Sequence, residues 1–330
     1  MLKQRNLFLD YFRGVSIIIV VLGHAIQICY GAPTDPVHSV IQTFQMSLLF
    51  VISGFSSGFS EPVKDFKKYF WAKVKRILFP YLVWLELNFL LVSLLQSKYS
   101  IVSQLKNLLL SQFWFLRILF LMFVVYGVFV LVYRGIKVIK NCILKASAAT
   151  LAAGILTFLL SRVPGCESIL NYIPFFVFGN VLYKLANIFT AKKYLAIFYG
   201  ATTALAVMFP VSIFLLFRTE GLLQMLIDKS LAFSGIAFCY IVCRLIYAVP
   251  WLKKLSAMVE GIGANTLPIY AIHWCIFFNI PLPLYKLMVA GIGLYPSAFV
   301  VAVLWVILCL FLIFLFRKTK LTRVFLLGEK

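Results

Sequence analysis

The chain has 330 residues, of which 63% are apolar and 12% are charged, and its formal net charge is +21. A soluble fold of this length cannot bury so much apolar surface, so the composition excludes a soluble protein and predicts that lipid surrounds most of the chain. The excess of Lys and Arg is interpreted as cytoplasmic segments facing anionic lipid rather than as a nucleic-acid surface.

Ten hydrophobic segments, each long enough to cross a bilayer as a helix, follow one another along the chain. They lie at roughly 13–32, 37–59, 77–97, 113–133, 143–161, 170–189, 194–217, 230–249, 262–281 and 291–316. The connections between them are short. We therefore predict an all-α, polytopic transmembrane helix bundle that occupies residues 1–330 as a single domain, with no fused soluble domain and no cleavable signal peptide.

The basic residues are distributed as this layout predicts. With the N-terminus in the cytoplasm, 24 of the 31 Lys and Arg residues lie in cytoplasmic segments, six lie in outer loops, and Arg117 lies within a span. This distribution obeys the positive-inside rule. An even number of spans returns the chain to its starting side, so both termini are predicted to be cytoplasmic.

The seven cysteines lie mostly inside apolar segments. Their spacing fits neither a metal site nor a disulfide framework. We therefore expect no metal cofactor.

The first span carries the most informative polar residues. Arg13 and His24 are eleven residues apart, which leaves only about 20° of rotation on an α-helix and roughly 16 Å along its axis. Asp10 can pair with Arg13 on the same face. The pattern predicts a cation at the cytoplasmic rim and a titratable imidazole well inside the membrane, which suits a long ligand with an anionic head and a reactive tip, such as acyl-CoA. If so, both side chains should face protein, with a passage joining them; the alternative is a structural histidine bonded to a neighbouring helix.

Five parts of the chain, in this order, resemble the integral-membrane acyltransferase family 3. Residues 9–15 (LDYFRGV) and 20–25 (VVLGHA) are similar to its first-helix signature, in which a basic residue, ten intervening residues and a His mark the catalytic helix. The other four parts are residues 44–55 (FQMSLLFVISGF), 73–81 (KVKRILFPY), 114–116 (WFL) and 265–273 (NTLPIYAIH). The resemblance covers the chain from about residue 5 to its end.

The chain departs from the family pattern at four positions. Gln45 and Ser47 stand where the second helix of the family often carries His and Pro, Lys73 stands for the first Arg of a basic pair, and Thr266 replaces a common Ser. Lys keeps the charge but lacks the bidentate geometry of Arg toward phosphate. Because none of these positions is His24, the departures bear on binding more than on the reaction.

The resemblance implies an acetyl-CoA-dependent O-acyltransferase of the bacterial inner membrane. His24 would act as general base or as a transient acyl carrier. Arg13, Lys73 and Arg76 would hold the CoA phosphates at the cytoplasmic mouth; for Lys73 and Arg76 the alternative is a basic loop that only marks topology. The implied partners are acyl-CoA, a glycan or lipid-linked sugar of a surface polysaccharide or exopolysaccharide, and membrane lipid, with a homo-oligomer possible and no nucleic acid.

Three further polar residues lie inside predicted spans, where charge is costly. Glu86, in the third span, either orients His24 as a second catalytic group or pairs with Arg117. Arg117, near the outer end of the fourth span, either contacts a substrate or neutralises Glu86. His273, in the ninth span, either lines the same cavity as His24 or bonds to a neighbouring helix.

The first outer loop contains Asp35 and His38. We interpret these residues as part of a solvated turn. The alternative is that an acceptor entering from outside passes them.

Two other functions fit parts of the pattern. Ten spans with polar residues near the midplane and helices interrupted by Gly or Pro also fit a transporter or polysaccharide exporter. A carrier, however, needs no phosphate anchor below a histidine on one helix face. A different class of membrane acyltransferase, which uses His and Asn, is matched faintly by Asn265 and His273, but the first helix argues against it.

Overall fold

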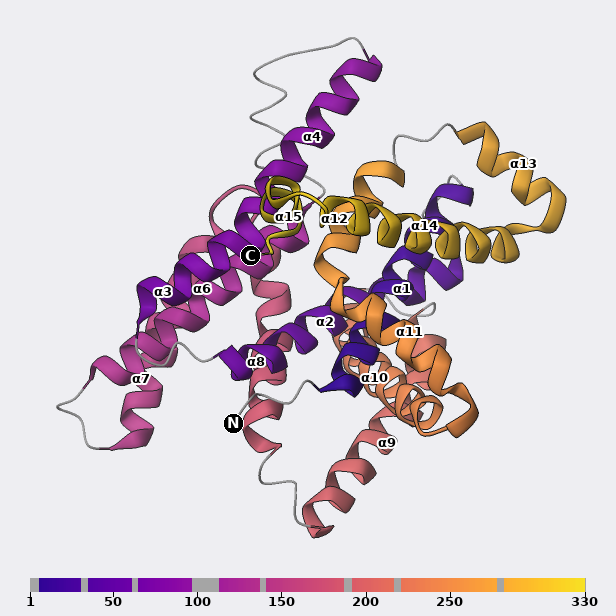
Figure 1. Cartoon of the computed structure of the whole chain (residues 1–330). Coiled ribbons are helices and arrows are strands. Elements are labelled where there is room, and N and C mark those ends of the chain that lie inside the picture. The colour runs from indigo at the N-terminus through magenta and orange to yellow at the C-terminus, as the bar shows by residue number, and fades with distance from the viewer. Residues whose placement is uncertain are drawn as a thin grey trace.

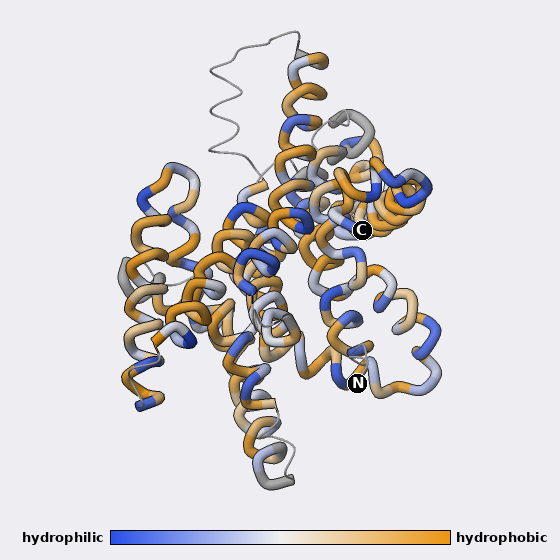
Figure 2. The backbone as a smooth tube through the Cα atoms, turned by 60° about the vertical axis from the view of Figure 1, so that its left-hand side comes forward, coloured by the Kyte–Doolittle hydropathy of each residue, from blue (hydrophilic) through white to orange (hydrophobic). Residues whose placement is uncertain are grey.

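The computed structural model describes residues 6–30, 35–60, 65–96, 113–136, 141–186, 192–216, 221–277 and 282–329, and within these ranges the chain is helical with no strand (Figure 1). Eight of its helices are long and apolar enough to cross a membrane, by length and composition. Figure 2 shows hydrophobic residues along most of the length of the helices, with hydrophilic stretches between them. The predicted all-α polytopic bundle is confirmed.

The described helices follow one another along the chain. They are α1 (Leu7–Tyr30), α2 (Pro36–Ser57), α3 (Phe66–Lys73), α4 (Phe79–Gln96), α6 (Trp114–Gly135), α7 (Cys142–Ser161), α8 (Ser168–Leu185), α9 (Lys192–Leu216), α10 (Gly221–Tyr247), α11 (Lys253–Ala264), α12 (Thr266–Phe277), α13 (Leu282–Ile292), α14 (Leu294–Phe316) and α15 (Lys320–Leu327).

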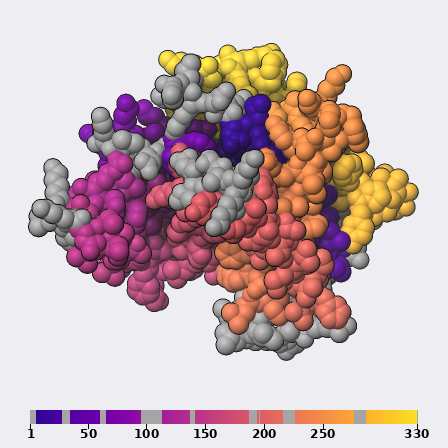
Figure 3. Space-filling model, turned by 90° about the horizontal axis from the view of Figure 1, so that it is seen from below, coloured from indigo at the N-terminus to yellow at the C-terminus, as the bar shows by residue number. Residues whose placement is uncertain are grey.

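Helix α1 lies at the centre of the bundle. It packs against α2, α11, α12, α13 and α14 and touches α10. Half of its most apolar stretch is buried inside the protein, against 11% for α7, so α1 is a helix of the interior and α7 is a helix whose surface is left to lipid. In Figure 3 the indigo beginning of the described chain reaches the surface beside the orange segments, on one face of the molecule.

Glycines allow α1 and α11 to touch backbone to backbone. A Cβ on Gly14 would lie 2.1 Å from the carbonyl oxygen of Val259, and a Cβ on Gly263 would lie 1.7 Å from the carbonyl oxygen of Asp10. Neither position can hold a larger residue unless a backbone moves. Small residues of this kind are what lets membrane helices approach closely, and here they fix α11 against the end of α1 that carries Asp10.

Helices α2 and α8 meet in the same reciprocal way. A Cβ on Gly54 would lie 1.9 Å from the carbonyl oxygen of Phe176, and a Cβ on Gly179 would lie 1.9 Å from that of Val51. Close by, the side chain of Asn180 donates to Ser57 Oγ at 2.8 Å. The sequence Ser-Gly at 53–54 is thus a packing element of α2.

The basic segment before the third predicted span is helical, whereas the alternative given for Lys73 and Arg76 was a basic loop. Asp65 caps α3 by accepting from Lys68 N–H, and Tyr69 of α3 donates its hydroxyl to the carbonyl oxygen of Phe123 in α6 at 3.0 Å. A π-helical turn, Val74–Leu78, joins α3 to α4. Aromatic residues of α3 pack on α6 and order this segment despite its many charges. The π turn is a second feature of the segment, and single π turns often occur at functional sites.

The ninth predicted span, 262–281, is broken. Helix α11 ends at Ala264 and α12 begins at Thr266. Asn265 lies between them, and its side chain donates to the carbonyl oxygen of Gly261 at 2.7 Å. A side chain that competes for helix carbonyls, with Pro268 in the next turn, favours an interruption that hydropathy does not register. Residues 278–281 lie outside the described ranges.

The sixth predicted span corresponds to α8, which is not one of the eight helices that qualify as spans. Its apolar run contains Asn171, Asn180 and Lys184. The remaining eight predicted spans are found as helices whose ends differ from the predicted ends by a few residues, except that α1 and α10 begin several residues earlier.

Candidate active site

Helix α1 is unbroken from Leu7 to Tyr30, so Arg13 and His24 lie on one face, roughly 16 Å apart along the axis. Arg13 Nη1 donates to Asp10 Oδ1 at 2.8 Å, which confirms the predicted ion pair. Arg13 Nη2 donates to Ser56 Oγ at the end of α2. The Arg13 side chain is 28% exposed, whereas that of Asp10 is 8% exposed. The guanidinium is therefore fixed at two points and still accessible.

His24 lies among rings contributed by α12. Its ring centroid is 4.7 Å from that of Trp274, in an edge-to-face arrangement, and 5.5 Å from that of His273. His273 is fully buried, and its Nδ1 lies 2.9 Å from the carbonyl oxygen of Ile269. The structure thus brings together two histidines that are far apart in the sequence, and His24 faces protein rather than lipid.

One ring nitrogen of His24 has a contact within α1 itself. Nδ1 of His24 lies 3.4 Å from Gln27 Oε1, one turn further along α1. An amide oxygen can only accept, so the imidazole tautomer that fits this contact carries its proton on Nδ1 and its lone pair on Nε2. Gln27, and not Glu86, is therefore the group that contacts this ring nitrogen in the described structure, and Nε2 can act as a base.

The face of α1 between Arg13 and His24 is apolar. Ile17 and Val20, which lie on it, are fully buried. On α2, Leu49 and Ile52 are buried between Ser56, which contacts Arg13, and the part of α2 that lies against Gly23. These apolar side chains of α1 and α2 suit a flexible, uncharged chain better than a charged ligand.

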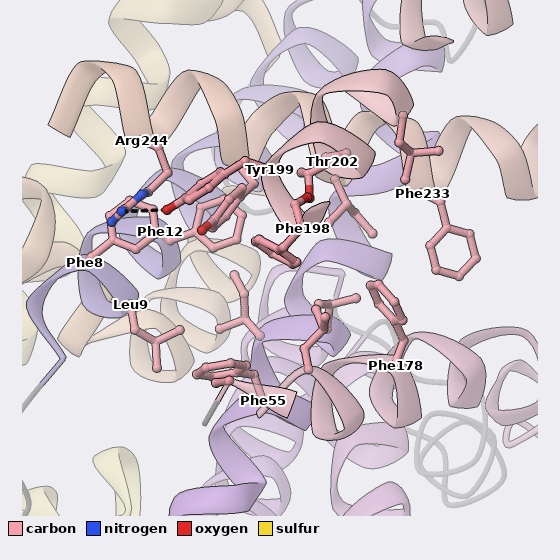
Figure 4. A pocket seen from close by; sticks show the side chains of 18 of the residues that line it. Phe8, Leu9, Phe12, Phe55, Phe178, Phe198, Tyr199, Thr202, Phe233 and Arg244 are labelled. Atoms are coloured by element: carbon pink, nitrogen blue, oxygen red, sulfur yellow. Dashed lines mark hydrogen bonds between the residues drawn. The ribbon is translucent and has the colours of Figure 1, made fainter. Parts of the chain in front are cut away.

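A cavity of about 400 Å³ flanks the adjacent face of α1. Phe8, Phe55 and Phe198 surround it, and at one end Arg244 donates to the hydroxyl of Tyr199 at 3.0 Å (Figure 4). A second apolar cavity lies between α1, α2, α9 and α10. Among the described residues, neither cavity is lined by Arg13 or His24, so neither is the passage that we expected between them.

The basic residues of the third segment separate into two groups. The Lys73 ammonium lies 3.8 Å from the centroid of the Phe123 ring, in a cation–π contact with α6, and the residue is half-buried. Lys75 and Arg76 are exposed on the π turn. The backbone of Arg76 lies directly against Gly328, near the end of α15. Lys73 is thus directed toward α6, whereas Arg76 is free to meet a ligand outside.

Glu86 and Arg117 have different surroundings. Glu86 is exposed on α4. Arg117, in the first turn of α6, is half-buried, and its Nη2 donates to the carbonyl oxygen of Gly165 at 2.6 Å. Arg117 therefore holds the connection between α7 and α8. Its predicted contact with a substrate stays a prediction.

Comparison with known proteins assigns the chain to a family. The acyltransferase domain family matches residues 6–315, almost the whole length. The chain belongs to this acyltransferase family. Nodulation protein NolL of Mesorhizobium japonicum is 27% identical over 187 residues, which are 54% of this chain and 48% of NolL, so the chain spans about half the length of this relative. No solved structure matches.

Family membership and the apolar helices together indicate a multi-pass membrane protein of the acyltransferase family. In this acyltransferase the first outer connection differs from the expected solvated turn. Asp35 and His38 are buried, at 4% and 1% exposure. Asp35 caps α2 by accepting from His38 N–H, and it also accepts from the hydroxyl of Tyr295 in α14 at 3.0 Å. A contact 260 residues away buries this carboxylate, and no local pattern could reveal it.

Other residues near the site of the acyltransferase were not singled out as functional. Gln27 and Trp274 contact His24, and their positions, three residues after His24 and directly after His273, are a usable signal. Arg317 donates to Asn265 Oδ1 at 2.6 Å and pairs with Glu329 at 2.5 Å. The hydrogen bond with Glu329 raises the pKa of Arg317 above its usual value. This pair joins the α11–α12 break to the last described residues.

Proposed function

We propose that the protein transfers an acetyl group from cytoplasmic acetyl-CoA to a hydroxyl of a surface polysaccharide or its lipid-linked sugar precursor, in the bacterial inner membrane. The observation that carries this proposal is the unbroken α1, which presents an accessible Arg13 and the His24 ring on one face, roughly 16 Å apart. Family membership supports acyl transfer in general. The donor, the acceptor and the role of His24 are the proposed part.

The donor lies along this face of α1 with its phosphates at Arg13. The guanidinium is held by Asp10 and Ser56 in a fixed orientation, so it can bind phosphate with little loss of side-chain freedom. Arg76 and Lys73 supply further positive charge. The pantetheine arm then follows the apolar stretch at Ile17 and Val20, which requires the packed α1 and α2 to separate there.

The thioester reacts at His24. Nε2 removes the proton of the acceptor hydroxyl while the oxygen attacks the thioester carbonyl carbon. The new C–O bond forms, the C–S bond breaks, and the CoA thiolate leaves and takes up the proton from the imidazolium. In the alternative order Nε2 attacks first and carries the acyl group before the hydroxyl receives it. Both orders use the same nitrogen.

Thioester turnover tests the proposal directly. The purified protein in lipid nanodiscs receives acetyl-CoA and octyl glucoside, and released CoA thiol and acetylated glycoside are measured. We expect both products from the wild-type protein and neither from His24→Ala. A transporter or exporter would release no CoA, so the absence of His24-dependent turnover would overturn the proposal in favour of that rival.

A further inference from the structure

Gln45 of α2 is a buried polar residue with an unmet hydrogen-bonding group. Its side chain is 4% exposed, and within the described part of the chain its Oε1 has no hydrogen-bond partner. Leaving such an acceptor unsatisfied in an apolar interior destabilises the fold. A Met or Leu side chain at position 45 should therefore make the folded protein more stable than Gln45 does.

The position of this amide relates it to His24. Gln45 Oε1 lies 3.0 Å from the place where a Cβ on Gly23 would stand, and Ile41, one turn earlier on α2, lies 3.1 Å from the same place. A larger residue at position 23 would require one of these two side chains to shift by a few tenths of an ångström. Gln45 therefore reaches α1 one residue before His24, at the reactive end of the proposed donor site.

The other members of the polar row on α2 have polar contacts within the protein. Asp35, His38, Gln42 and Gln45 are spaced by three and four residues and share one helix face. Asp35 accepts from His38 N–H and from Tyr295, and the side chains of Gln42 and His38 meet at 3.1 Å. These contacts give the three other members polar partners on α2 or α14. Gln45 Oε1 has no such contact, and it lies against Gly23, the residue before His24.

We propose that Gln45 is an acceptor-binding residue whose Oε1 receives a second hydroxyl of a polyhydroxyl acceptor, next to the hydroxyl that reacts at His24. This inference rests on the proposed function. The attacking hydroxyl gives its proton to His24, and a neighbouring hydroxyl of the same sugar donates to Gln45. An amide oxygen accepts only from a donor group, so the pair selects a polyol over a simple alcohol.

The register of the helices favours the acceptor over the donor as the ligand of Gln45. Ser56 of α2 stands level with Arg13, and Gln45 stands level with Gly23. The pantetheine amides would lie between these levels, where α2 presents Leu49 and Ile52. In addition, Gly23 is about 100° around α1 from His24. Gln45 therefore approaches from beside the face of α1 along which the donor is proposed to lie.

The test compares two acceptors that share an octyl chain, octyl glucoside and 1-octanol, with acetyl-CoA as donor and protein in nanodiscs. We expect Gln45→Met to lower kcat/KM for octyl glucoside about tenfold, the effect of one lost hydrogen bond, and to leave transfer to 1-octanol and the KM for acetyl-CoA unchanged. Gln42→Met, one turn away on the same face, should keep the wild-type preference. The melting temperature of Gln45→Met should equal or exceed that of the wild type.

The outcomes separate the two proposals. If the wild-type protein transfers to neither acceptor and releases no CoA, the proposed function fails and takes this inference with it. If the wild type turns over but Gln45→Met keeps its preference for the glycoside, only the inference is overturned. An equal loss with both acceptors, or a raised KM for acetyl-CoA, would also overturn it, because Gln45 would then serve the donor or the fold.

Discussion

The two ends of α1 are held in different ways. At the Arg13 end the guanidinium has two fixed partners, and Gly14 and Gly263 lock α1 against the backbone of α11. At the His24 end the ring lies against two rings of α12, and its contact with Gln27 is long, at 3.4 Å. One end is a rigid charged anchor, and the other is a ring with an adjustable partner.

This difference suggests a division of labour. An anion site gains from rigidity, because orientation that is fixed in advance costs nothing on binding. A proton-transfer group gains from a local partner that can tighten as charge develops. Substitutions at the two ends should therefore change different kinetic constants: KM for the donor at the Arg13 end, and kcat at the His24 end.

The largest expected effect is at the His24 end. His24→Ala should lower kcat at least about 100-fold, because a positioned general base contributes about 10²–10⁴ in rate. Binding of acetyl-CoA, measured by calorimetry on the same protein, should stay within about twofold, since its phosphates lie at the other end. A variant that keeps more than about 3% of wild-type turnover would exclude both assigned roles of His24.

The second effect is at the Arg13 end. Arg13→Ala should raise KM for acetyl-CoA about ten- to hundredfold, because a charge-assisted phosphate contact is lost and Asp10 is left buried without its cation. The value of kcat should fall much less. Steady-state kinetics over a range of donor concentrations measures both constants.

Ser56→Ala is the matched control for Arg13→Ala. It removes the second partner of the guanidinium and keeps the charge and the ion pair with Asp10. We expect KM to change by no more than about threefold. If Arg13→Ala lowers kcat and leaves KM unchanged, the division between the two ends is wrong.

Much of the fold and part of the site could be predicted from the sequence. Long apolar runs determine where helices cross a membrane, because in lipid each helix must satisfy its own backbone. The pairing of Asp10 with Arg13 follows from a spacing of three residues on one helix. The shared face of Arg13 and His24 follows from a spacing of eleven residues. These features depend on residues close together in the chain.

The features that escaped prediction depend on contacts between distant segments. Asp35 is buried because Tyr295 reaches it, and the basic segment is ordered because Tyr69 packs on α6. Hydropathy averages over the break at Asn265, since its neighbours on both sides are apolar. The close α1–α11 contact needs glycines on two separate helices, and one sequence does not tell which glycines meet.

The third expected effect tests the rigidity of the Arg13 end. Gly263→Ala places a methyl group 1.7 Å from the carbonyl oxygen of Asp10, so α11 must move away from α1. Overpacking of this kind costs about 1–3 kcal/mol, which thermal unfolding in detergent would detect as a lower melting temperature. Gly261→Ala, on the same helix with nothing within 4 Å of its Cβ, should leave the melting temperature unchanged. Equal behaviour of the two variants would contradict the close contact.

The smallest expected effect concerns Arg76, which extends the charged end of the molecule. Arg76 is exposed on the π turn, so water and salt screen its attraction for phosphate. Arg76→Ala should raise KM for acetyl-CoA about three- to tenfold at low salt and by less at high salt, with kcat unchanged. Lys75→Ala removes an equally exposed charge one residue away and serves as the matched control. If both variants raise KM equally, the segment acts through its total charge, and only the paired guanidinium of Arg13 is then a directed contact with the donor.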